Sequence, residues 1–194
     1  RPGDFFQAMP AASGALGLAL VKWTGVVADP DPGQPNVNAL IALSDMTNGQ
    51  PVAVLAGNRV TALRTAAMTA IAAKRLARAD SNALAFIGTG VQARSHLAAL
   101  QPMFPGLTKA SLFGRTPASV ASFAGAVRAA GLEAVISANA REAVESADIA
   151  VTSVPAAQGL RPFLDGAWIK PGAFASMVDL GRSWRPDTIR DLDI

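Results

Sequence analysis

The sequence predicts an α/β protein, in which a Rossmann-type doubly wound parallel sheet follows a smaller antiparallel domain of α+β character. Three observations lead to this prediction. The glycine turn Gly88-Thr89-Gly90 stands between an apolar run and a segment with helical spacing. Strands alternate with helices after that turn, which is typical of a parallel sheet covered on both faces. The part before residue 60 contains short extended runs and the hairpin signal Asn48-Gly49.

The first domain is predicted from four extended runs, at residues 5–9, 16–27, 38–43 and 52–55. Turn residues bound these runs, and the proline-rich loop 29–36 cannot be helical. The pattern changes at residues 61–79, an Ala-rich stretch without Gly or Pro that ends in basic residues. Cations suit the carboxyl end of a helix dipole, so this stretch is predicted to be a long helix.

The glycine turn has the spacing of a dinucleotide-binding fingerprint. Gly88 follows an apolar strand at 83–87, and Gly90 and Ala93 take the next two small positions. Gly88 allows a tight turn, and Gly90 lacks the Cβ that would block a diphosphate. We therefore expect a dinucleotide with its diphosphate at the N-terminus of the helix that begins at Val91. The alternative is an ordinary turn between a strand and a helix.

The later strands are predicted at 110–113, 134–136, 149–153 and 173–178, with helices at 117–130 and 141–146. Thr116 is the predicted N-cap of the helix that starts at Pro117. The carboxyl ends of parallel strands form the ligand crevice of such a sheet. Besides the glycine turn, these ends carry the pairs Gly114-Arg115, Ser153-Val154 and Val178-Asp179.

The end of the second parallel strand indicates which cofactor is preferred. NAD-selective sites carry an acidic residue there for the ribose 2′-hydroxyl, whereas this chain has Gly114, Arg115 and Thr116. A cation without a carboxylate favours a 2′-phosphate, so we expect NADP(H) in preference to NAD(H). The alternative is that Arg115 faces solvent.

Three further features carry chemistry. Arg64 and Thr65 are placed near the start of the long helix, where a guanidinium, a hydroxyl and free backbone N–H groups can converge on an anion. Lys22 is a lone cation inside a strand, either a ligand or a snorkelling lysine. Asp179 ends an apolar run and is either a proton donor, with a pKa raised by apolar walls, or a turn residue.

Composition narrows the classes of function. Of the 194 residues, 51% are hydrophobic and 16% charged, which excludes a disordered chain. The net charge of +3 comes from scattered residues, so no nucleic-acid partner is expected. The absence of cysteine and the single histidine argue against a metal site. No stretch is long enough to span a bilayer, and a cytoplasmic protein without a membrane partner is expected.

These residues give the chain a resemblance to the ornithine cyclodeaminase and mu-crystallin family. The resemblance rests on Thr61-Ala-Leu-Arg64-Thr65-Ala-Ala followed by Gly88-Thr-Gly-Val-Gln92-Ala, and it extends through nearly the whole chain. It implies a substrate-binding and dimerisation domain at 1–62, a connecting helix at 63–80 and an NAD(P)-binding domain at 81–194. It also implies a homodimer. Members of the family have further residues before position 1 and after position 194.

The resemblance also implies roles for individual residues. Lys22 and Arg64 match the pair that binds the substrate α-carboxylate, and Met9 and Gln7 match positions near the substrate. Thr65, Val91 and Gln92 match contacts to the cofactor phosphates. Asp179 matches the catalytic aspartate, although it stands two residues earlier than the Gly-x-Asp sequence of many members. His96 is expected to pack or to make a hydrogen bond on the cofactor side.

The expected activity is reduction of a cyclic imino acid, Δ1-pyrroline-2-carboxylate or Δ1-piperideine-2-carboxylate, to L-proline or L-pipecolate. Ornithine cyclodeaminase members tend to carry an acidic residue where Gln7 stands, so Gln7 favours the reductase. Conversion of L-ornithine to L-proline and ammonia is an alternative. Alanine dehydrogenase is another enzymatic alternative. A crystallin-like protein that binds NADP(H) without turnover is the alternative outside enzymes.

Overall fold

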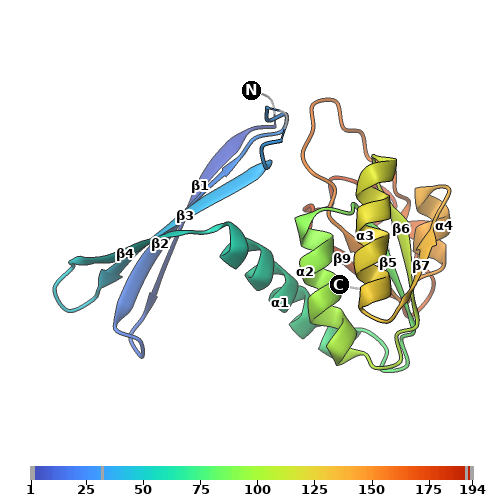
Figure 1. Cartoon of the computed structure of the whole chain (residues 1–194), viewed down its shortest axis with the longest axis horizontal. Helices are drawn as coiled ribbons and strands as arrows, with labels where there is room; N and C mark the ends of the chain where they lie inside the picture. Colours follow the sequence, from blue (N-terminus) through green and yellow to red (C-terminus); the bar gives the residue numbers. More distant parts are fainter. Residues whose placement is uncertain (1–2, 32, 191, 193–194) are drawn as a thin grey trace. The chain divides into compact units, whose positions relative to one another are not determined.

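The computed structural model describes residues 3–31, 33–190 and 192. It divides into two compact units (Figure 1). The first comprises Arg1–Ala62 together with the short segment Ala156–Gly159, and the second comprises Leu63–Pro155 and Leu160–Ile194.

The first unit is built on a four-stranded antiparallel sheet of order β1-β2-β3-β4. Its strands are β1 (Phe5–Ser13), β2 (Leu18–Val26), β3 (Val37–Asp45) and β4 (Pro51–Ala56). β1 runs past the predicted range because Pro10 lies on an edge strand, where a missing N–H leaves no bond unmade. The turn between β3 and β4 contains Gly49, whose φ of +73° requires the freedom of glycine.

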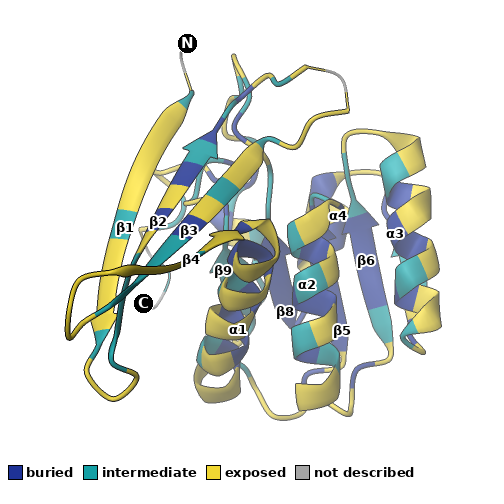
Figure 2. Cartoon of the chain, turned by 60° about the vertical axis from the view of Figure 1, so that its left-hand side comes forward, coloured by how far each residue is buried: buried dark blue, intermediate teal, exposed yellow. Residues whose placement is uncertain are grey.

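Both edge strands of this sheet are exposed along most of their length (Figure 2). On the inner strand β2 the two faces differ, since Lys22, Thr24 and Val26 are buried while Val21 and Trp23 are exposed. This alternation follows from the two-residue repeat of a strand. The sheet therefore has one face that buries polar groups and one that leaves aromatic and aliphatic side chains uncovered.

The second unit contains a five-stranded parallel sheet of order β7-β6-β5-β8-β9. Its strands are β5 (Ala83–Ile87), β6 (Lys109–Phe113), β7 (Glu133–Ile136), β8 (Ile149–Thr152) and β9 (Phe174–Met177). The order places the first strand of the unit in the middle of the sheet, with the crossovers running outward on both sides of it. This is the Rossmann-type arrangement that the alternating pattern predicts.

Four α-helices and two 3₁₀ turns are described: α1 (Asn58–Leu76), α2 (Val91–Leu100), α3 (Pro117–Ala129), α4 (Ala140–Glu145), η1 (Gln101–Met103) and η2 (Gly166–Trp168). Alternate residues of β5 face two separate cores. Leu84 and Phe86 pack with apolar side chains of α1, α2 and α3, whereas Ile87 packs with α4 and Trp184. The sheet is thus covered on both faces, as a doubly wound fold requires.

Asp148, directly before β8, fixes the amino end of the central strand β5. Its Oδ2 accepts hydrogen bonds from Asn82 N at 2.8 Å and Ala83 N at 3.0 Å, and its Oδ1 pairs with Lys170 Nζ at 2.7 Å. Burial pushes the pKa of Asp148 upward, but the ammonium and the two N–H groups outweigh burial, so the pKa is lowered. The carboxylate therefore stays charged inside the unit.

Candidate functional site

The two glycines of the turn after β5 have different roles. Gly88 has a φ of +93°, and a Cβ there would lie 2.8 Å from the carbonyl oxygen of Ser153. A Cβ on Gly90 would meet nothing within 4 Å. Gly90 is also the N-cap of α2 and supplies no side-chain cap to the first N–H groups of that helix. The helix start is therefore open to a ligand, while Gly88 is needed by the fold.

Two polar side chains near this turn lack hydrogen-bond partners among the described residues. Gln92 Oε1, in the first turn of α2, and Ser153 Oγ, after β8, are both shielded from solvent. The backbone joins their surroundings to the turn, since Ser153 N donates to Ile87 O at 2.8 Å. A buried polar atom without a partner is costly, so such atoms mark a place for a ligand. A dinucleotide, rich in donors and acceptors, fits this arrangement.

Val91 and Val154 complete the predicted contacts around the turn. Val91 is exposed at the start of α2, with 68% of its surface accessible, and Val154 is half-buried after β8. Both are available to an apolar part of a ligand.

The end of β6 holds the pair predicted to select the cofactor. Thr116 is the N-cap of α3, as predicted, and its Oγ1 accepts a hydrogen bond from Ser119 N at 3.3 Å. Thr89 of the glycine turn donates to Ser119 Oγ at 3.1 Å, so the two loops are linked. Arg115 is exposed beside this cap. Thr116 is thus occupied by its helix, and Arg115 carries the positive charge of the loop.

Asp179 lies directly beyond β9 with its side chain turned inward, only 4% exposed. Its oxygens accept hydrogen bonds from Ser183 Oγ at 2.6 Å, Thr152 Oγ1 at 3.1 Å and Gly181 N at 3.2 Å. The prediction of apolar walls around this carboxyl is wrong, because donors from the same turn and from β8 surround it. The turn also includes Leu180, which has a φ of +60°.

The antiparallel sheet brings three predicted substrate-binding residues onto one face. Met9 lies opposite Lys22, and Gln7 lies opposite Thr24, in the pairing of β1 with β2. Directly opposed residues of antiparallel strands point to the same side. Lys22 is 7% exposed and donates to Thr61 Oγ1 at 3.2 Å, so it does not snorkel to solvent.

Thr24 is a member of this face that the sequence analysis missed. Its Oγ1 is buried and has no hydrogen-bond partner in the described part of the chain. The signal was its position two residues after Lys22 in the same strand, which puts both side chains on one face.

Arg64 and Thr65 lie farther into α1 than predicted. α1 begins at Asn58 rather than at 61, and the N–H of Thr61 already donates to Gly57 O at 2.9 Å. The free N–H groups of a helix are confined to its first turn, so those near Arg64 and Thr65 are engaged in the helix. The expectation that free N–H groups assist these two residues is wrong. Arg64 is nevertheless exposed, and its guanidinium is accessible.

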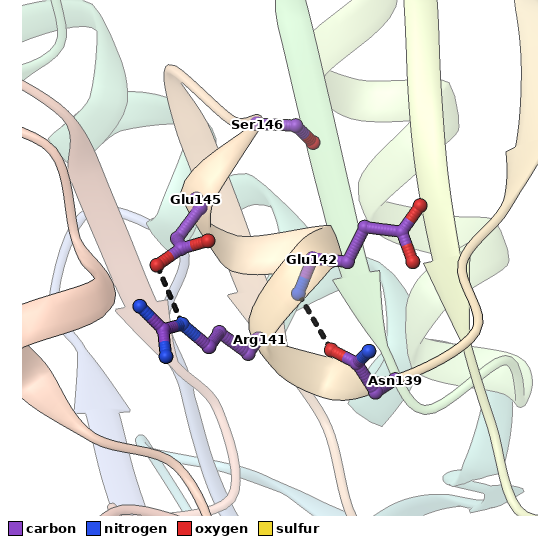
Figure 3. Close-up of a pocket in the computed structure, with 5 residues that line it drawn as sticks. All are labelled: Asn139, Arg141, Glu142, Glu145 and Ser146. Atoms are coloured by element: carbon purple, nitrogen blue, oxygen red, sulfur yellow. Dashed lines mark hydrogen bonds and ion pairs between the residues drawn. The ribbon is translucent and has the colours of Figure 1, made fainter.

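A shallow depression along α4 is a second candidate, lined by Asn139, Arg141, Glu142, Glu145 and Ser146 (Figure 3). Asn139 Oδ1 accepts from Glu142 N at 2.9 Å, and Arg141 Nε donates to Glu145 Oε1 at 2.7 Å. These bonds cap and brace a short helix. These polar groups of the depression therefore stabilise α4.

Among the residues that the structure describes, no three His, Asp or Glu side chains are grouped so that they can hold a metal ion. None of the described helices combines the length and the apolar character that crossing a membrane requires.

The chain resembles known proteins in both sequence and structure. Residues 2–186 match the family model described as ornithine cyclodeaminase/mu-crystallin family. Ketimine reductase mu-crystallin from Mus musculus is 34% identical over 183 residues, which cover 93% of this chain and 56% of that protein. The chain thus spans about half the length of the relatives it matches.

Two solved structures have the same fold. The Δ1-pyrroline-2-carboxylate reductase of Thermococcus litoralis, in complex with NADH and L-proline, superposes with a TM-score of 0.81 at 32% identity. The match covers 89% of this chain and 53% of that one. An archaeal alanine dehydrogenase dimer with bound NAD gives a TM-score of 0.79 at 32% identity, covering 90% and 52%.

Proposed function

Because this chain belongs to the ornithine cyclodeaminase/mu-crystallin family, we propose that the protein reduces a cyclic imino acid with a nicotinamide cofactor. Its substrate is Δ1-pyrroline-2-carboxylate or Δ1-piperideine-2-carboxylate, and its product is L-proline or L-pipecolate. The observation that carries the proposal is the open helix start at Gly90, beside the unpartnered buried oxygens of Gln92 and Ser153. The Thermococcus litoralis reductase, which has the same fold, holds NADH and L-proline.

The cofactor would be held at the carboxyl edge of the parallel sheet. Backbone N–H groups at the start of α2 bind the diphosphate, with Gly88 making the turn and Gly90 leaving the space. Gln92 and Ser153 take the polar groups of the ligand, Val91 and Val154 its apolar faces, and Thr65 a phosphate oxygen. When bound, the nicotinamide supplies a hydride to the imine carbon.

NADP(H) is proposed as the preferred form, with NAD(H) also accepted. Arg115 supports this preference, since its exposed guanidinium follows β6 where an NAD-selective site has a carboxylate. A guanidinium binds a 2′-phosphate through paired hydrogen bonds.

The substrate carboxylate would be bound by Lys22 and Arg64, with Met9 and Gln7 beside it. Lys22 supports this role because it is buried on a polar face of the sheet, where an ammonium interacts strongly with an anion. A carboxylate fixed at two cations places the imine carbon in one orientation, which converts binding into correct alignment for transfer.

Asp179 would organise proton delivery to the imine nitrogen. The three donors hold its carboxyl group in one orientation. In this role its carboxylate would accept a hydrogen bond from a water molecule beside the imine nitrogen, and that water would pass on the proton.

A homodimer through the antiparallel sheet is part of the proposal. Phe6, Trp23 and Val54 leave much of their surface exposed in this sheet, and Phe6 stacks on Trp23 with ring centroids 6.0 Å apart. An extended apolar surface of this kind marks an association site. The archaeal alanine dehydrogenase of the same fold is a dimer.

The proposal is tested by steady-state assays of this 194-residue chain. NADPH and NADH are each offered with pyrroline-2-carboxylate, piperideine-2-carboxylate, or pyruvate plus ammonia, and NAD⁺ with L-ornithine. Oxidation of NADPH with a cyclic imine supports the reductase. Activity with ornithine alone would identify a cyclodeaminase instead of a reductase. Activity with pyruvate plus ammonia alone would identify an alanine dehydrogenase. Quenching of NADPH fluorescence without turnover of any substrate indicates a crystallin-like binding protein.

A further inference from the structure

His96 is a buried titratable residue that the proposed reaction does not use. It lies in α2 with none of its surface accessible. Its Nδ1 is 2.7 Å from the backbone oxygen of Gln92, and its Nε2 is 3.0 Å from Thr69 Oγ1. Thr69 Oγ1 is in turn 2.8 Å from Ser176 Oγ. One continuous chain of hydrogen bonds therefore links α2, α1 and β9.

The Gln92 carbonyl fixes the direction of the first bond, and a neutral ring then fixes the other two. A backbone carbonyl only accepts, so Nδ1 of His96 must carry a hydrogen. In a neutral imidazole Nε2 is then an acceptor, and Thr69 must donate to it. With its hydrogen used in this way, Thr69 accepts from Ser176. The contact with the Gln92 carbonyl thus requires a hydrogen on Nδ1, and in a neutral ring that is the one ring proton.

The electrostatic surroundings agree with a neutral ring. Burial lowers the pKa of His96, and the carbonyl of Gln92 opposes burial without cancelling it. The two groups bonded to the ring nitrogens, the Gln92 carbonyl and the Thr69 hydroxyl, are uncharged.

Each element in the chain carries a residue of the proposed site or ends shortly before one. On α1, Thr69 is four residues after Thr65, and on α2, His96 is four residues after Gln92, so each pair lies on one helix face. On β9, Ser176 stands three residues before Asp179. The chain of hydrogen bonds thus holds α1, α2 and β9 in fixed positions relative to one another, and the proposed cofactor site depends on these positions.

We propose that His96, as the Nδ1–H tautomer, is a positioning residue that holds α1 and β9 against the cofactor-binding turn of α2 through Thr69 and Ser176. The inference rests on the proposed function for its effect on cofactor affinity, and the tautomer is independent of that function. If the lost hydrogen bond no longer holds the cofactor-binding arrangement in place, its energy is lost from cofactor binding. One buried neutral hydrogen bond corresponds to about fivefold weaker affinity.

The first test reads the tautomer directly. His96 is the only histidine of the chain, so ¹⁵N-histidine labelling gives one pair of ring-nitrogen signals without assignment. At neutral pH we expect a protonated Nδ1 and an unprotonated Nε2. A protonated Nε2, alone or in an imidazolium, would overturn the proposal whether or not the protein binds a nucleotide.

The second test compares variants of the hydroxyl partners, with NADPH affinity measured by fluorescence. Thr69→Val removes the donor at nearly constant shape, and Thr69→Ser retains it, so we expect about fivefold weaker binding in the first and near-normal binding in the second. Ser176→Ala should have a smaller effect, because Thr69 still donates to the ring. Ser176→Ala also serves as the readout if Thr69→Val does not fold.

Ser111→Ala is the matched control. Ser111 Oγ makes a buried 2.8 Å bond to Ser146 Oγ in the same unit, away from this chain of bonds. Its loss should lower stability without changing NADPH affinity. Equal weakening in Ser111→Ala and Thr69→Val, or none in Thr69→Val, contradicts the positioning role. If the wild-type chain binds no nucleotide, the proposed function is contradicted instead. The ¹⁵N measurement of the His96 tautomer then still tests the inference about His96.

Discussion

Lys22 Nζ donates a hydrogen bond to Thr61 Oγ1 over 3.2 Å, which joins the middle strand of the antiparallel sheet to the first turn of α1. Thirty-nine residues separate the two in sequence. The bond directs the ammonium of Lys22 toward the helix that carries the Thr61-x-x-Arg64-Thr65 motif. The bond supports the proposal that Lys22 binds the substrate carboxylate.

Lys22→Met is expected to raise KM for the cyclic imine about tenfold, with a smaller change in kcat. The variant keeps the length of the side chain and removes one charge-assisted bond to the carboxylate, which is present in both ground and transition states. Steady-state kinetics measure the effect. Lys74→Met, at an exposed position near the end of α1, is the control. An unchanged KM in Lys22→Met removes this residue from the site.

Gly88→Ala and Gly90→Ala should fail in different ways. At Gly88, the positive φ and the approach to Ser153 make a Cβ costly, by about 1–3 kcal/mol of unfolding free energy. At Gly90 a methyl group finds open space, so the chain should fold normally but bind NADPH on the order of tenfold more weakly, having lost access to helix N–H groups. Urea unfolding and fluorescence titration separate the two. If folded Gly90→Ala binds NADPH normally, the diphosphate does not lie at the start of α2.

Arg115→Ser is expected to weaken NADPH binding about tenfold and to leave NADH binding unchanged. The reason is that the lost guanidinium would contact the 2′-phosphate alone. Arg128→Ser, at an exposed position in the last turn of α3, controls for the change in net charge. Equal losses for both cofactors would show that Arg115 does not select between them.

Asp148→Asn should lower the free energy of unfolding by about 2 kcal/mol at pH 7. The reason is that it removes the negative charge that pairs with Lys170 and accepts hydrogen bonds from two backbone N–H groups. The pKa of Asp148 is lowered in the folded chain. Its contribution is therefore complete above the unfolded pKa of about 3.9 and is lost as the pH falls through the lower folded pKa.

Urea unfolding at a series of pH values tests this sign. The stabilities of the wild type and Asp148→Asn should converge in acid and differ at neutral pH. Asp80→Asn is the control, because Asp80 pairs with Arg78 in an exposed turn. A difference that grows as the pH falls would contradict the assignment.

Asp179→Ala is expected to reduce the unfolding free energy by roughly 2–3 kcal/mol, because Ser183, Thr152 and Gly181 lose their acceptor inside the fold. Asp179→Asn keeps one acceptor oxygen and should restore part of that stability. If the carboxylate organises the proton, kcat stays low in Asp179→Asn even where the fold is retained. Asp187→Asn, on the exposed part of the same loop, should change neither quantity. Normal kcat in folded Asp179→Asn would assign the residue to the turn alone.

Local sequence determined the elements and their type. The apolar run before Gly88, the Thr116-Pro117 start of α3 and the Asn48-Gly49 turn each act over a few residues, and the structure has a strand, a capped helix and a hairpin there. Strand and helix periods also fixed which residues of β5 face each core. These features were predictable because the forces that set them act between near neighbours.

The surroundings of individual side chains were decided by tertiary structure alone. Asp179 meets Thr152 from 27 residues away, and Thr69 meets Ser176 across 107 residues. No local pattern specifies which hydroxyl lies opposite a given carboxylate or ring nitrogen, because that depends on how strands and helices from distant parts of the chain pack. The sequence by itself therefore determined a glycine turn at a sheet edge, and packing decided that Asp179 is held by donors and that His96 joins three elements.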